Sequence, residues 1–209
     1  MSRKGNYLGE EEMWKLFKQG DKQAFAMLYS LHVDAVYRYG TKICEDEDTV
    51  KDCIQDLFFE LYQKRNSIKI GPNHIKFYLF LALKRELIRQ LNAQRKKALL
   101  PEEDGFFQTE YSIEHRLIHD EEKALRNRRI KALIKRLPAK QREIMYLRFN
   151  ESMEYDEIAE ITSISIESAR KQVYRAVKTV REMFRKEIAV GFTLMLRKAV
   201  EDKLSMFKV

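Results

Sequence analysis

The stretch from Tyr155 to Val180 constrains this chain most, because it has the order of a helix-turn-helix: a short amphipathic helix, a corner and a second helix. The corner is Ser163–Ser165, and Ser165 is a natural N-cap for the second helix. Apolar residues recur every three or four positions and predict one packed face: Ile158, Ala159, Ile161, Ile166, Ala169, Val173 and Val177.

The opposite face of the second helix is polar and largely basic. It carries Glu167, Ser168, Arg170, Lys171, Tyr174, Arg175 and Lys178. Lys and Arg side chains bind DNA phosphates. In a major groove, Arg also favours contact with guanine and Glu favours contact with cytosine. These residues are therefore the predicted contacts to duplex DNA.

Helix breakers are rare in the rest of the chain, with 7 Gly and 3 Pro among 209 residues. The predicted fold class is all-α, with two helical domains joined by a flexible linker and the helix-turn-helix in the second. We expect an N-terminal domain of four helices at residues 8–97, an acidic linker at 98–113, a second domain at 114–186 and a C-terminal helical extension at 187–209.

Charge falls into blocks along the chain. Residues 64–97 hold 10 Lys and Arg against 1 acidic residue, and residues 126–186 hold 16 against 8. Residues 98–125 between them hold 2 against 8. Two cationic segments separated by an acidic one indicate two nucleic-acid contacts on a chain whose halves move relative to each other.

The segment after Glu45–Asp48 predicts a helix with two distinct faces. Its packed side is apolar and consists of Val50, Ile54, Leu57, Phe58 and Leu61. Asp52, Gln55, Asp56 and Phe59 share another face at i, i+3, i+4 and i+7. An aromatic ring beside carboxylates is typical of a protein-docking patch, and an ordinary solvated face is the alternative.

The next helix carries a basic stripe that can follow phosphates, formed by Arg85, Arg89, Asn92 and Lys96. At its leading end lie Tyr78 and the polar loop 66–73. An aromatic ring and loop amides of this kind can hold an unstacked base.

Together these segments resemble a bacterial RNA polymerase sigma factor of the two-domain, extracytoplasmic-function class. Residues 20–25 with Leu28-Tyr29 are similar to the family's opening segment, and residues 52–58 to its polymerase-docking helix. Residues 137–144, 155–159 and 165–166, with Arg175-Ala176, are similar to its −35-binding module. Any one segment can match by accident, whereas the order and spacing of all of them favour the family.

The resemblance implies a factor that binds RNA polymerase core and directs promoter-specific transcription initiation through −10 and −35 DNA contacts. Asp52, Gln55 and Asp56 would bind the clamp helices of the largest catalytic subunit. The segment 78–95 is similar to the part that opens and reads the −10 element. The residues expected to contact −10 DNA are Tyr78, Lys84, Arg85, Arg89, Asn92 and Lys96.

The resemblance also implies an anti-sigma partner. It further implies that the acidic linker threads a cationic channel of the polymerase, with a plain solvated tether as an equally weighted alternative.

Several positions depart from the family pattern. Ser152 and Ser163 stand where glycine is usual, and Glu154 replaces the usual Ser or Thr cap. A left-handed serine at such a corner costs on the order of 1 kcal/mol, which a packed domain absorbs. Tyr78 replaces a tryptophan and Lys84-Arg85 replaces an Arg-Asn pair, so no −10 base preference is inferred.

Two other classes of function compete with this one. A stand-alone helix-turn-helix regulator would bind DNA as a dimer, but it leaves the patch around Asp52 unexplained. An enzyme would rest on His115 and His119, whose i, i+4 spacing suits zinc but lacks the internal Glu of a zinc hydrolase. We therefore expect no catalysis, no metal and no cofactor.

Cys44 and Cys53 fit packed, reduced thiols. The chain has neither an apolar run that inserts into a membrane nor a secretory signal, so a cytoplasmic location is expected. The extension carries Ile188, Phe192, Met195 and Ala199 at helical spacing, which favours packing on the second domain over docking to a regulator.

Overall fold

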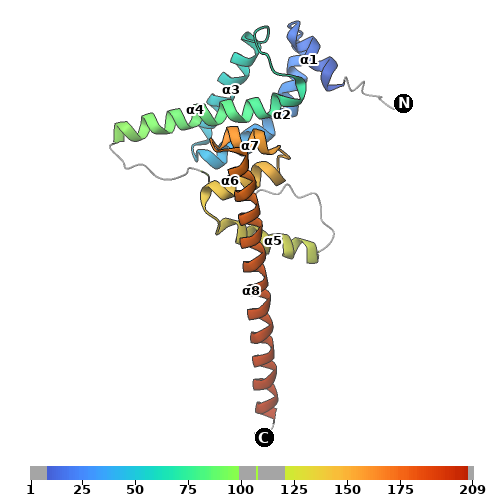
Figure 1. Ribbon diagram of the computed structural model, residues 1–209, viewed down its shortest axis with the longest axis vertical. Coiled ribbons are helices and arrows are strands. Elements are labelled where there is room, and N and C mark those ends of the chain that lie inside the picture. The colour runs from blue at the N-terminus through green and yellow to red at the C-terminus, as the bar shows by residue number, and fades with distance from the viewer. Residues whose placement is uncertain (1–8, 99–106, 108–120, 207–209) are drawn as a thin grey trace, which may run out of the picture.

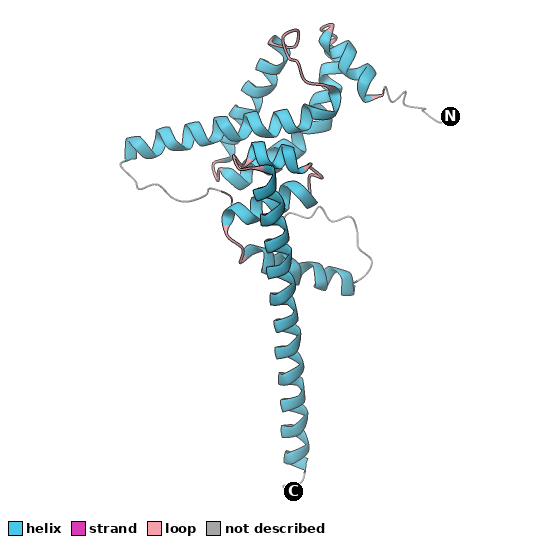
Figure 2. Ribbon diagram, viewed as in Figure 1, coloured by secondary structure: helices cyan, strands magenta, loops and turns pink. Residues whose placement is uncertain are grey.

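The computed structural model describes residues 9–98, 107 and 121–206. The regular secondary structure of the described residues is helical, with loops between the helices and no strand (Figure 2), so the predicted all-α class is confirmed. None of the described helices combines the length and the apolarity of a membrane span.

The N-terminal domain contains the four predicted helices. They are α1 (Glu10–Lys18), α2 (Lys22–Ile43), α3 (Glu47–Gln63) and α4 (Ile75–Ala98), and a 3₁₀ helix, η1 (Pro72–His74), precedes α4. Helices α2, α3 and α4 pack against one another (Figure 1). Gly40 permits this close packing, because a Cβ there would lie 2.7 Å from Cγ1 of Val50.

The corner between α1 and α2 explains the motif that opens at Gly20. Gly20 has a left-handed φ of 91°, and its amide donates to the Phe17 carbonyl while that of Asp21 donates to Leu16. This pattern is a Schellman C-cap, in which glycine is favoured because it has no Cβ to strain. The Asp21 carboxylate then accepts from the Ala24 amide at 2.8 Å and caps α2.

The faces predicted for α3 are confirmed. Its apolar side is buried, Asp46 caps its N-terminus, and Glu47 and Asp48 occupy its first turn. Cys44 and Cys53 are buried free thiols, as expected. Burial is the main cause that raises the pKa of Cys53 to about 11.

The second domain contains α5 (Glu121–Lys135), α6 (Ala139–Phe149), α7 (Tyr155–Ile161) and α8 (Ile166–Met206). Helices α7 and α8 are the two helices of the predicted helix-turn-helix. The hydroxyl of Ser165 accepts from the Ser168 amide at 3.1 Å, which confirms the predicted N-cap. Ser152 and Ser163 have φ values of 57° and 53°, so both are left-handed where the family uses glycine.

The sequence predicts core at Ile144, Leu147 and Phe149 in the helix before the helix-turn-helix, as well as at Ile166, but two of these residues are exposed. Phe149 is 59% exposed and Ile166 is 44% exposed, because one ends α6 and the other begins α8. A residue at a helix end has fewer packing partners than one in the middle of a helix. An apolar residue there can fit the helical spacing and still be exposed to solvent. Ala176 of α8 is fully buried, although the apolar spacing above does not include it.

Helix α8 is continuous over 41 residues. The expected extension from residue 187 is helical as predicted, but it belongs to the same helix as the recognition segment rather than to a separate element. In Figure 1 its C-terminal turns run away from both domains, which differs from the expectation that the extension packs on the second domain.

The two domains lie directly against each other instead of standing apart. Buried residues of α2, α4, α6 and α7 belong to one hydrophobic core, and α4 contacts α7. Phe107, from the segment expected to be a solvated linker, is 3% exposed within that core. At Phe107 this segment packs against both domains, because burial removes the large apolar surface of the ring from water. The expectation of a flexible linker otherwise concerns residues 99–106 and 108–113, which lie outside the described residues.

Candidate nucleic-acid and protein interfaces

Helix α3 presents the candidate docking face as an exposed strip. Asp52, Gln55, Asp56 and Phe59 are all exposed, and Phe59 keeps 62% of its surface accessible. The adjacent Phe58 is buried and packs edge-on against Tyr29 of α2, with ring centroids 4.7 Å apart. An exposed aromatic side chain this large, next to carboxylates, is the composition of a protein-binding surface.

Helix α4 presents the expected −10 residues in two different states. Arg89 and Asn92 are exposed, and Arg89 forms an ion pair with Glu86 of its own helix at 2.6 Å. Lys84 is half-buried, and Arg85 points toward Glu160 of α7 at 3.7 Å. Tyr78 is also half-buried, and the side chain of Lys96 lies outside the described residues.

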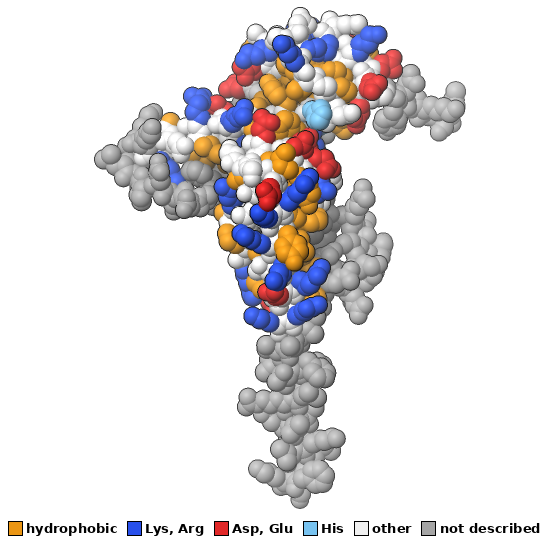
Figure 3. All heavy atoms as spheres, viewed as in Figure 1, with side chains coloured by type: hydrophobic (Ala, Val, Ile, Leu, Met, Phe, Trp, Pro, Cys, Tyr) orange, Lys and Arg blue, Asp and Glu red, His pale blue; other side chains and the backbone are white. Residues whose placement is uncertain are grey.

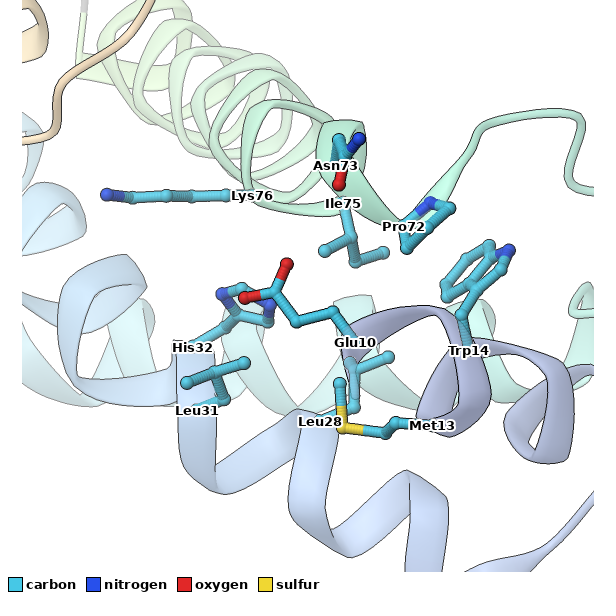
Figure 4. A pocket seen from close by; sticks show the side chains of 10 residues that line it. All are labelled: Glu10, Met13, Trp14, Leu28, Leu31, His32, Pro72, Asn73, Ile75 and Lys76. Atoms are coloured by element: carbon cyan, nitrogen blue, oxygen red, sulfur yellow. The ribbon is translucent and has the colours of Figure 1, made fainter. Parts of the chain in front are cut away.

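A cavity of about 180 Å³ lies beside the loop that leads into α4 (Figure 4). Residues from α1, α2, η1 and the start of α4 line it, including Trp14, His32, Asn73 and Lys76, whereas Tyr78 does not. This cavity was not predicted from the sequence. The available signal was the spacing Leu28, His32, Val36, which places the histidine on the buried side of α2.

His32 is the unusual residue of this cavity. It is 8% exposed, and its Nε2 atom has no hydrogen-bond partner in the described structure. Burial, followed by the charge of Lys76, lowers the pKa of His32 to about 4. The imidazole is therefore neutral at physiological pH and can donate or accept one hydrogen bond inside the cavity.

The N-terminal part of α8 carries the expected −35 face. Six of the seven predicted contact residues are exposed, Ser168 is half-buried, and Tyr174 is the most open at 71%. Lys171 and Lys178 form ion pairs with Glu167 and Glu182 of the same helix, at 2.6 and 4.0 Å. Figure 3 shows Lys and Arg side chains gathered over the described surface of the second domain.

Tyr155 fixes α7 beside α8. Its ring lies under two guanidinium groups, Arg148 at 4.8 Å and Arg170 at 5.5 Å from the ring centroid. Arg148 also donates to the Met153 carbonyl at 2.7 Å and pairs with Glu154 at 3.2 Å. The residue that replaces the usual cap thus takes part in the corner between α6 and α7.

The C-terminal domain meets the expected −10 surface with carboxylates, which the sequence analysis did not foresee. Glu143 of α6 is buried, and its Oε1 accepts from the Tyr39 hydroxyl at 2.7 Å and from Lys84 Nζ at 2.6 Å. Burial, and then Glu143, raise the pKa of Tyr39 well above its usual value. These partners are 104 and 59 positions apart, so no local pattern reveals them.

A metal centre finds no support in the part of the chain that the structure describes, where no three ligating side chains cluster. His115 and His119, the basis of the enzyme hypothesis, lie outside the described residues.

Comparison with known proteins agrees with the geometry. Residues 28–97 match the sigma-70 region 2 model, residues 127–180 match the sigma-70 region 4 model, and together they cover more than half of the chain. RNA polymerase sigma factor SigV of Bacillus subtilis (strain 168) is 26% identical over 170 residues, which are 81% of this chain and 96% of SigV.

Two solved structures share the fold. The sigma factor RpoE from Bartonella quintana, solved with the anti-sigma factor NepR, has a TM-score of 0.54 and 20% identity over 78% of this chain and 98% of RpoE. CnrH, solved with the cytosolic domain of CnrY, has a TM-score of 0.53 and 17% identity over 85% of this chain and 97% of CnrH. With regions 2 and 4 present in order, the chain belongs to the sigma-70 family, as a two-domain sigma factor of the extracytoplasmic-function class that directs transcription initiation by RNA polymerase.

Proposed function

We propose that this sigma factor attaches to RNA polymerase core through α3, where Asp52, Gln55, Asp56 and Phe59 meet the clamp helices of the largest subunit. The observation that carries this proposal is their exposure on one face of a helix whose apolar side is fully used in the core. Phe59 supplies the apolar anchor, and the carboxylates supply orientation. A stand-alone regulator has no use for such a face, and the match to region 2 does not favour that alternative.

We propose that the N-terminal domain also captures the melted −10 strand. Arg89, Asn92 and Lys96 would follow the phosphates along α4. The cavity of about 180 Å³ beside η1 would receive one unstacked base, with Trp14 for apolar contact and the unpartnered Nε2 of His32 for a hydrogen bond. Tyr78, Lys84 and Arg85 would complete the surface.

The −35 duplex is proposed to bind the open face of α8. Ser165 defines the end that enters the groove, and the seven residues from Glu167 to Lys178 that are predicted above supply phosphate and base contacts. The domains of this proposal are region 2 at residues 8–97, region 4 at 114–186 and the linker at 98–113 between them.

The proposed partners are polymerase core, promoter DNA and an anti-sigma factor. Support for the last comes from RpoE, a protein of the same fold that was solved with the anti-sigma factor NepR. The proposed factor has no catalytic residue or cofactor of its own and acts in the cytoplasm, where promoters and polymerase are found.

The docking proposal is tested with the triple variant Asp52→Ala, Gln55→Ala, Asp56→Ala mixed with polymerase core. Loss of two carboxylates and an amide from one interface should weaken the complex by about tenfold or more. Complex formation is measured by size-exclusion chromatography with mass determination, and run-off transcription on a cognate promoter follows function. The matched control is Glu11→Ala, Glu12→Ala on α1, which removes the same charge from another exposed surface. Equal binding by the triple variant and the control contradicts the docking site.

A further inference from the structure

Helix α8 extends well beyond the part of it that packs on the other helices of region 4. Its packing side includes the fully buried Ala176 and reaches Met183, and Arg136 of α5 pairs with Glu187 at 3.2 Å. The helix then continues to Met206, about 28 Å further at 1.5 Å per residue. In Figure 1 these distal turns lie away from both domains.

The distal part of α8 carries an apolar series on a different side of the helix. Continued from Met183 at intervals of three and four residues, the packing side passes through Glu187, Val190, Leu194, Lys198, Glu201 and Ser205, so it becomes polar. A second series at alternating intervals of three and four is apolar except for one lysine. We call it the heptad stripe, and it consists of Ala189, Phe192, Leu196, Ala199, Lys203 and Met206.

The heptad stripe does not face the domain that α8 packs on. Phe192 follows Met183 by nine residues, or about two and a half turns, which places the two residues on opposite sides of the helix. A continuous α8 therefore cannot turn the stripe toward region 4 of its own chain. An apolar side that repeats in heptads is typical of a helix that pairs with another helix.

A second copy of the same segment, running antiparallel, complements the heptad stripe. One register pairs Ala189 with the partner's Met206, Phe192 with the partner's Lys203, and Leu196 with the partner's Ala199. Two of these layers join a large residue to a small one, and the third joins an aromatic residue to a cation. No layer brings together two large residues or two charges.

Lys203 favours the antiparallel orientation over the parallel one. In a parallel pair each stripe residue lies opposite its own copy, so Lys203 would oppose a second Lys203 between the helices. In the antiparallel register the two lysines are separated by 11 residues along the axis, or about 16 Å. A single polar residue in an otherwise apolar seam specifies orientation in this way.

The polar residues of the segment favour a protein partner over a lipid surface. Outside the heptad stripe, residues 188–206 carry two cations, Arg197 and Lys198, and two carboxylates, Glu201 and Asp202. A helix that lies on anionic lipid instead carries mainly Lys and Arg on its polar side. The balanced charges therefore suit a helix whose polar side faces water while its stripe is covered by another helix.

We propose that this sigma factor self-associates through the distal part of α8, where the heptad stripes of two copies pack antiparallel between residues 189 and 206. Met183 lies about 9 Å before the first layer, so the packed part of region 4 stays outside the paired segment. The contact goes beyond promoter and polymerase binding, because it uses neither the docking face of α3 nor the −35 face of α8.

The test measures the mass of the full-length chain in solution. In sedimentation velocity at protein concentrations of about 1 to 100 µM, the apparent mass should rise from the monomer's 25.0 kDa toward twice that value. Leu196→Asp places an unpaired charge in a central layer and should weaken self-association by about tenfold or more. The matched control is Leu194→Asp, which makes the same change outside the heptad stripe and should leave self-association unchanged.

A second pair of variants tests the antiparallel register. Phe192→Glu and Phe192→Lys remove the same ring, but the first introduces a carboxylate opposite the partner's Lys203, whereas the second introduces a like charge there. Phe192→Glu should therefore associate about tenfold more tightly than Phe192→Lys. In a parallel pair each new charge would lie opposite its own copy, and both variants would be weakened alike. Circular dichroism establishes that all four variants remain helical.

A constant monomer mass at every concentration overturns the proposal, and so does equal weakening by Leu196→Asp and Leu194→Asp. Equal association of the two Phe192 variants overturns the antiparallel pairing. A monomer that co-sediments with phosphatidylglycerol vesicles would identify a lipid surface as the occupant instead. None of these experiments contains polymerase or promoter DNA, so their outcome is independent of the proposed function.

Discussion

The two surfaces of this sigma factor that are proposed to bind DNA carry similar residues in opposite states. On α8 the ion pairs join neighbours on one helix, such as Lys171 with Glu167, and both partners are largely exposed. On α4, Lys76, Lys84 and Arg85 pair with carboxylates of the other domain, and the pair between Lys84 and Glu143 is buried. Exposed pairs of this kind contribute little and exchange readily for phosphate, whereas a buried pair opens only when its surroundings move. Availability for DNA therefore depends on burial and partners rather than on the number of cations.

The largest effect is expected from Phe107, which packs where the two domains meet on the α4 side. Phe107→Ala should lower the free energy of unfolding by about 3 kcal/mol, because it removes a buried ring that packs between Tyr39 and Tyr146. Urea unfolding measures this. Phe149→Ala, which removes a largely exposed ring, is the control and should change stability by less than about 1 kcal/mol. Similar losses in both variants would show that Phe107 does not hold the domains together.

Acid should lower the free energy of unfolding through His32, which lines the cavity of the N-terminal domain. Its folded pKa of about 4 lies below the ordinary 6.5, so the unfolded chain binds a proton first as pH falls. The stabilisation is complete above pH 6.5, declines as pH falls toward 4, and amounts to at most roughly 3 kcal/mol. His32→Gln should flatten this part of the stability curve, measured by urea unfolding at several pH values. The exposed His74→Gln serves as the control, and an unchanged slope in His32→Gln would refute the assignment.

In the free protein, substitutions on the exposed face of α8 should weaken binding to duplex DNA, whereas substitutions on the α4 surface that contacts the other domain should not. Arg175→Ala is expected to weaken binding to a generic duplex by about 1 kcal/mol and to reduce the logarithmic salt slope by about 0.9, because one phosphate contact is lost. Lys84→Met should leave duplex binding unchanged. Anisotropy titrations over a range of salt concentrations measure both quantities, and equal losses would abolish the contrast between the two surfaces.

The smallest effect concerns the corner between α7 and α8, and it tests how much Ser163 and Ser165 contribute to the stability of the protein. Ser163→Gly should stabilise the protein by about 0.5–1 kcal/mol, because glycine adopts the left-handed φ without strain. Ser165→Ala, two positions later, should instead destabilise it by about 1 kcal/mol through loss of the N-cap. Thermal unfolding distinguishes the two, and a loss of stability in Ser163→Gly would mean that its side chain has a role beyond the turn.

Much of the fold could be predicted because its signals are local. The spacing of Val50, Ile54 and Leu57 fixes the buried side of α3 and leaves Phe59 outside, and the structure agrees. Helix caps are also local, so the role of Ser165 could be predicted from its place before an apolar period. The same reasoning wrongly predicted burial of Phe149 and Ile166, because periodicity does not show which residues at a helix end lack packing partners.

The contacts between domains could not be predicted in this way. Glu143 belongs to a helix start that looks polar, and nothing near it in sequence indicates that Tyr39 and Lys84 will surround it. Phe107 lies in a segment with Pro101, three successive acidic residues and Gly105, where composition favours a solvated tether and does not single out this one ring for burial. Long-range polar burial depends on how two finished domains fit, which is a property of surfaces rather than of any one segment.

The length of α8 has a mechanical consequence. Because the end proposed to enter the groove and the distal end form one helix of 41 residues, they span about 60 Å at 1.5 Å per residue and tilt together. A tilt of about 10° at the reading end displaces the far end by about 10 Å in a rod of that pitch. A partner that binds the far end of α8 would therefore set the tilt of the end that is proposed to contact the promoter.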